Sequence, residues 1–94
     1  MNTTIVLYTM KGCPWCTDMK DLLKETNIKY KERDIDKYKK EYDLFVEATG
    51  NDYVPAFMVL KLDENNEVVQ HHFLNPDKDF QELSEAIEKI KALL

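Results

Sequence analysis

Residues 4–19, TIVLYTMKGCPWCTDM, decide the fold because they contain a strand, a turn and the start of a helix. Thr4–Thr9 is β-branched and aromatic, which is typical of a buried strand. From Pro14 to about Thr26, apolar residues recur at three- and four-residue steps, which predicts a helix. Pro14 suits the first helical position because the amide that proline lacks would have no partner there. Cys13 and Cys16 therefore lie at a strand-to-helix turn.

The middle of the chain predicts a second strand and a second helix. Residues 29–35 are short and mixed, which indicates an edge strand. Residues 37–49 predict a helix with Gly50 as its C-cap. Four apolar residues share one stripe of this helix, and we expect them in the core: Tyr38, Tyr42, Phe45 and Val46.

The last third of the chain predicts a hairpin and a final helix. Ala56–Leu62 and Glu67–Phe73 are strands joined by the turn residues Asp63-Glu64-Asn65-Asn66. Phe80, Leu83, Ile87, Ile90 and Leu94 follow in helical steps. We expect Asn75-Pro76-Asp77 to begin that helix with a cap, a first-turn proline and an acid.

The order β-α-β-α-β-β-α predicts one α/β domain over residues 1–94. One helix can join the first two strands as a parallel, right-handed unit. The hairpin then extends the same sheet, and helices cover both faces. No linker or repeat interrupts this order.

Composition limits the function classes. The 94 residues are 44% apolar and 33% charged, which is too apolar for a disordered chain. Lys and Arg number 13 against 18 Asp and Glu, a net charge of −5, so we expect neither nucleic-acid nor membrane binding. Met1-Asn2-Thr3-Thr4 lacks the features of a secretory signal, so we expect a cytoplasmic location with reduced thiols. At this size we expect a monomer.

Cys13-Pro14-Trp15-Cys16 is the main chemical feature. Two cysteines with this spacing in a cytosolic βαβ context indicate a dithiol redox site. Free amides at the helix start favour a thiolate on Cys13, which would attack a target disulfide. Cys16, one turn further and less exposed, would resolve the mixed disulfide.

Two alternatives are a zinc half-site and a pair of inert core thiols. Zinc needs two further ligands, and the only histidines are the adjacent His71 and His72. Neighbouring strand residues point to opposite faces, so these two cannot readily chelate together. We expect them to be strand residues without a catalytic role, and we expect no metal site.

Val54-Pro55 precedes an apolar strand, where a proline belongs at the strand entrance. A cis bond here would present a backbone edge to the cysteine loop, where a peptide or glutathione could pair. Only about one X-Pro bond in twenty is cis, so a trans proline in a loop remains the alternative.

Three segments together resemble a dithiol glutaredoxin of the thioredoxin fold: residues 6–9, residues 12–16 and residues 49–55, the last reading TGNDYVP. The resemblance implies a four-stranded mixed sheet flanked by three helices, a cis Pro55, Cys13 as nucleophile and Cys16 as resolving thiol. It also implies reduction of protein disulfides and glutathione mixed disulfides, with glutathione as co-substrate and no bound cofactor. Thioredoxins resemble one another in a buried acidic residue at the position where this chain has Leu7, so the chain resembles a glutaredoxin more than a thioredoxin.

Six residues are candidates for binding the substrate or glutathione: Lys11, Trp15, Tyr53, Val54, Pro55 and Asp77. Lys11 either stabilises the thiolate or is a solvated loop lysine, and Trp15 either flanks a substrate or packs. A second set of lysines, Lys37, Lys39 and Lys40, could receive a glutathione carboxylate, although a solvated helix face is the simpler interpretation.

The chain departs from the family pattern at several places. Met10 occupies the usual position of a basic residue, Tyr53 replaces a threonine, and the family's Gly-Gly pair is missing, since Gly12 and Gly50 are the only glycines. Residues 72–78 faintly resemble glutaredoxin-like reductants of ribonucleotide reductase, which thioredoxin reductase recharges. That function, and a redox-inert binding module of the same fold, are the alternatives. An iron–sulfur role is disfavoured because Pro14 stiffens the loop.

Overall fold

The computed structural model describes residues 2–94 and contains four strands and three helices. In chain order they are β1 (Asn2–Thr9), α1 (Pro14–Glu25), β2 (Lys31–Asp34), α2 (Lys39–Thr49), β3 (Ala56–Leu62), β4 (Val68–Leu74) and α3 (Leu83–Leu93). The strands form one sheet in the order β2-β1-β3-β4. β1 is parallel to β2 and antiparallel to β3, and β3 and β4 form an antiparallel hairpin. The predicted element order and mixed sheet are confirmed.

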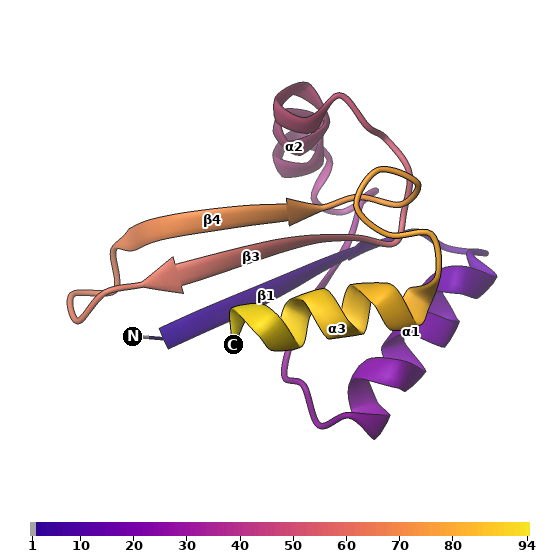
Figure 1. The fold of residues 1–94 in the computed structure, drawn as a ribbon. Helices are drawn as coiled ribbons and strands as arrows, with labels where there is room; N and C mark the ends of the chain where they lie inside the picture. The colour runs from indigo at the N-terminus through magenta and orange to yellow at the C-terminus, as the bar shows by residue number, and fades with distance from the viewer. Residues whose placement is uncertain (1) are drawn as a thin grey trace.

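The helices cover both faces of the sheet, with α2 on one face and α1 and α3 on the other (Figure 1). Side chains of β1 alternate between the two faces, as strand geometry requires. Ile5 and Leu7 pack with apolar residues of α1 and α3. Val6 and Tyr8 pack against α2. β1 therefore supplies both halves of the core.

The two glycines lie at the ends of helices, where the backbone adopts a positive φ. Gly50 caps α2 with a φ of 70°, and its N–H donates to the carbonyl of Val46 at 2.7 Å, which confirms the predicted C-cap. Gly12, in the turn before α1, has a φ of 75°, a region that side chains larger than glycine's rarely adopt. The cysteine pair thus follows a turn that needs glycine.

Tyr38 is not a core residue, contrary to the sequence prediction. α2 begins at Lys39, and Tyr38 is the exposed residue directly before it. The guanidinium of Arg33 lies over the Tyr38 ring, 4.7 Å from its centroid. This cation–π contact keeps the ring on the surface, whereas Tyr42 and Phe45 are buried as expected.

The prediction that Asn75-Pro76-Asp77 begins the last helix was wrong. Asp77 adopts a left-handed φ of 65°, which a continuous helix cannot contain. The Asp79 carboxylate accepts the Asn75 N–H at 2.8 Å, so residues 75–79 form a closed loop instead. α3 starts at Leu83 behind a capping box between Glu82 and Glu85.

No helix within residues 2–94 combines the length and apolar character that crossing a bilayer requires.

Leu7→Ala should destabilise the fold by about 2–5 kcal/mol, because Leu7 has no solvent exposure and truncation leaves a cavity in the core. Leu44→Ala changes an exposed leucine on α2 and should shift stability by no more than about 0.5 kcal/mol. Urea unfolding of both variants, with the cysteines held in one redox state, measures the difference. Equal losses would contradict the assignment of Leu7 to the core.

Candidate active site

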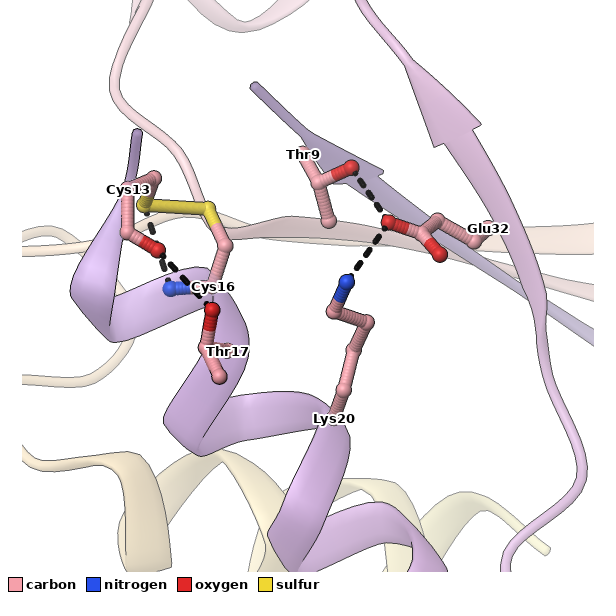
Figure 2. Close-up of a disulfide and its surroundings, with 6 residues drawn as sticks. All are labelled: Thr9, Cys13, Cys16, Thr17, Lys20 and Glu32. Atoms are coloured by element: carbon pink, nitrogen blue, oxygen red, sulfur yellow. Dashed lines mark hydrogen bonds and ion pairs between the residues drawn. A yellow bond between two sulfur atoms is a disulfide. The ribbon is translucent and has the colours of Figure 1, made fainter. Parts of the chain in front are cut away.

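Cys13 is the N-cap residue of α1, and Pro14 is at the first helical position, as predicted. The Cys16 N–H donates to the Cys13 sulfur, with an N···S distance of 3.1 Å (Figure 2). This amide belongs to the first helical turn, whose N–H groups have no acceptor within the helix. Together with the positive end of the helix dipole, it favours negative charge on the Cys13 sulfur.

The two cysteines differ in exposure. Cys13 is half-buried, whereas Cys16 is 2% exposed and faces the core. Their Cα atoms are 5.3 Å apart, within the range that disulfides span, and the two sulfurs are bonded in this structure (Figure 2). The pair can therefore close a ring within one helical turn, with Cys13 as the sulfur that an external disulfide can reach.

An open groove of about 340 Å³ adjoins Cys13. We call it the Trp15 groove, and it is lined by Met10, Gly12, Cys13, Pro14, Trp15, Tyr53, Val54, Pro76 and Asp77. Four of the six residues predicted to bind the substrate, Trp15, Tyr53, Val54 and Asp77, are therefore brought together beside the cysteine.

The other two predicted residues lie elsewhere. Pro55 is buried and does not line the groove, but the Val54–Pro55 bond is cis, as the family resemblance implied. Within residues 2–94 no hydrogen bond uses the main-chain N–H or C=O of Val54. Lys11 is exposed and lines a second pocket that also borders Cys13.

Asn51 joins the two loops that form the groove wall. Its side-chain amide donates to the Pro76 carbonyl at 3.1 Å, and its side-chain oxygen accepts the Tyr53 N–H at 2.8 Å. The Tyr42 hydroxyl donates to the Asp52 carbonyl at 2.7 Å. Burial, followed by the charge of Asp52, raises the pKa of Tyr42, so it remains a donor. No feature of the sequence had pointed to Asn51.

The second pocket, of about 420 Å³, lies on the side of the cysteines that faces β2. We call it the Glu32 pocket. One oxygen of Glu32 accepts the Thr9 hydroxyl at 2.8 Å and the Lys20 ammonium at 3.1 Å (Figure 2). The hydrogen bond from Thr9, and then that from Lys20, lower the pKa of Glu32 despite its partial burial.

Thr9, Lys20 and Glu32 were not among the residues predicted to form the site, although the sequence contained a signal for them. Thr9 ends β1, and the carboxyl ends of strands in α/β sheets commonly form sites. Cys16 follows Cys13 by three residues and Lys20 follows Cys16 by four, so the N-cap and these two residues of α1 lie along one side of the helix. Glu32 reaches them through the parallel pairing of β1 with β2.

No group of three or more histidine, cysteine, aspartate or glutamate side chains suited to a metal ion occurs within residues 2–94. His71 and His72 are both in β4, as expected.

Glu32→Gln should reduce the loss of folding stability that occurs as the pH falls. Because the folded pKa of Glu32 is below its ordinary value of 4.5, its charge stabilises the fold above that pH, and the contribution is lost as pH falls through the lowered value. The Glu32 and Lys20 side chains are 40% and 34% exposed, so the difference at neutral pH should be at most about 1 kcal/mol.

The measurement is urea unfolding of the wild type and the variant across about pH 3–7. Glu88→Gln, which changes an exposed glutamate of α3, is the matched control. Parallel stability curves for wild type and Glu32→Gln would show that the Thr9–Glu32–Lys20 contacts do not couple to folding.

Comparison with known proteins gives the family. A family model described as Glutaredoxin matches residues 5–61. Glutaredoxin 1 of Rickettsia felis and that of Rickettsia conorii are each 35% identical to this chain over 48 residues. Each match covers 50% of this chain and 47% of the relative, so it spans about half the length of these curated proteins.

Solved structures agree on the fold. The crystal structure of the thioredoxin-like protein BC3987 has a TM-score of 0.58 and 26% identity, covering 97% of this chain and 100% of that one. Glutaredoxin 1 from Francisella tularensis, complexed with cacodylate, has a TM-score of 0.52 and 19% identity, covering 98% of this chain and 96% of that one. With a thioredoxin-like fold, a Cys-Pro-Trp-Cys turn and a family match over more than half of its length, the chain belongs to the glutaredoxin family.

Proposed function

We propose that the chain is a glutathione-dependent thiol–disulfide oxidoreductase that reduces protein disulfides and glutathione mixed disulfides. The observation that carries the proposal is the position of Cys13. Its half-buried sulfur accepts the Cys16 N–H at the start of α1, while Cys16 is buried with its Cα 5.3 Å away. Such an arrangement suits an accessible nucleophile with a buried resolving thiol beside it.

The reaction proceeds in two exchanges. The Cys13 thiolate attacks one sulfur of the substrate disulfide, forms a mixed disulfide and releases the other substrate sulfur as a thiolate. Cys16 loses its proton and attacks the Cys13 sulfur, which closes the Cys13–Cys16 disulfide and releases the second substrate thiolate. The substrate gains two electrons and two protons, and the protein dithiol is oxidised.

Two glutathione molecules then restore the dithiol and leave as glutathione disulfide, without a bound cofactor. Family membership supports glutathione as reductant. The main chain of Val54 lines the Trp15 groove and could pair with an extended peptide such as glutathione. Lys11 borders the cysteine from the other pocket and adds a positive charge there. We place the reaction in the cytoplasm and expect a monomer.

Thioredoxin reductase is a second candidate reductant, with ribonucleotide reductase as the oxidised partner. One observation favours it. The Trp15 groove is lined by Met10 and contains no lysine or arginine among its lining residues. A groove of this kind offers few partners for the two carboxylates of glutathione.

Cysteine variants test the division of roles. Cys13→Ser should abolish turnover with every substrate because the attacking sulfur is lost. Cys16→Ser should still remove glutathione from a mixed disulfide, since that exchange needs only Cys13, but it should no longer reduce protein disulfides. Assays of both variants with a glutathionylated peptide and a protein disulfide measure this. Equal losses in both variants with both substrates would contradict the assigned roles.

A coupled assay separates the reductants. With glutathione and glutathione reductase, NADPH consumption should be sustained, and exchange with thioredoxin reductase as the only electron source should be much slower. Equilibration against a glutathione redox buffer should give a potential of about −200 to −230 mV. The reverse preference would favour the ribonucleotide reductase assignment, and activity with neither reductant would favour a redox-inert binding module.

A further inference from the structure

Three large apolar side chains converge around Cys13 without being buried. Met10, Trp15 and Tyr53 are 46%, 51% and 59% exposed, and all three line the Trp15 groove. They come from separate segments: the turn after β1, the first turn of α1 and the loop before β3. Single exposed apolar residues are common, but three that border one groove mark a surface that a partner covers.

The charge of the groove is negative. Asp77 is the only acidic residue among its lining residues, and no lysine, arginine or histidine lines it. The neighbouring Lys78 donates to the Thr49 carbonyl at 3.4 Å and is not a lining residue. Lys11 lines the Glu32 pocket instead. A substrate that carries a positive charge beside its disulfide therefore complements this surface better than an anionic one.

The backbone available in the groove suits an extended segment. Val54 lines the groove, and no hydrogen bond within residues 2–94 uses its main-chain N–H or C=O. A peptide can pair with these groups while its side chains reach the aromatic residues on either side. The exposed rings of Trp15 and Tyr53 offer apolar area at low conformational cost.

From these observations we propose that the Trp15 groove selects extended protein segments in which the disulfide cysteine is flanked by a large apolar residue and by lysine or arginine. The proposal rests on the proposed oxidoreductase function and names the substrate class of its groove. The exchange follows the two steps given above, with the protein dithiol as electron donor.

Four disulfide-containing peptides of equal length test the proposal. They combine leucine or serine on one side of the reactive cysteine with lysine or glutamate on the other. The rate constant of each with the reduced protein is divided by its rate constant with dithiothreitol, which removes differences in intrinsic reactivity. The leucine–lysine peptide should react about tenfold faster than the serine–glutamate peptide.

Variants separate the two sources of this preference. Tyr53→Ser, or Met10→Ser at a second position, should reduce the advantage of leucine over serine several-fold. Asp77→Asn, which retains a residue that tolerates the left-handed φ of 65°, should reduce the advantage of lysine over glutamate and its dependence on salt. The matched controls Leu44→Ser and Asp43→Asn change exposed residues of α2 outside the groove and should keep both advantages.

A small uncharged disulfide, hydroxyethyl disulfide, distinguishes the two proposals. Failure to reduce it would overturn the oxidoreductase function, and the substrate proposal with it. Reduction of it together with equal normalised rates for the four peptides would overturn the substrate proposal alone. Variant effects of equal size at α2 and in the groove would likewise overturn it.

Discussion

The position of the reactive sulfur depends on β1 being enclosed on every side. β2 and β3 pair with its two edges, and its side chains alternate between two cores, with Leu7 on one face and Tyr8 on the other. A shift of one residue would exchange these faces, so the register is strongly specified. Because β1 cannot slide, the turn at Gly12 and the start of α1 are fixed relative to the sheet.

Two surfaces of different chemistry meet at this fixed point. On the β2 side lies a polar cluster in which Glu32 accepts hydrogen bonds from Thr9 and Lys20. On the other side, Trp15 and Tyr53 leave apolar area uncovered. The Cys13–Cys16 disulfide lies between them, because Cys13 lines both the Glu32 pocket and the Trp15 groove.

The sequence predicted those parts of the fold in which local pattern and tertiary packing agree. β3 and α1 have strong periodicity or strong boundary residues, and both were predicted well. Asn75-Pro76-Asp77 suits a helix start and a loop equally, and contacts distant in sequence, such as that from Asn51 to Pro76, decide between them. Tyr38 fits an apolar stripe, yet its ring lies on the surface under the guanidinium of Arg33 from β2.

The site shows the same limit. Cys13 and Cys16 are only three residues apart and carry their own signature, whereas Glu32 reaches the site only through its pairing opposite Leu7 in the parallel strands. The register of such a pair is set by tertiary packing and cannot be read from one segment. The aromatic residues of the groove were predicted individually, but their convergence required the three-dimensional fold.

The Asn51 side chain has a consequence for molecular recognition. Its hydrogen bonds link the loop before β3 to the loop after β4, so these two walls of the Trp15 groove are fixed relative to each other. The conformational entropy of these loops is lost when the chain folds and not when a substrate binds, so a substrate segment enters a preorganised groove. Side chains on either wall can then be exchanged to retune partner choice while the scaffold that carries them stays in place.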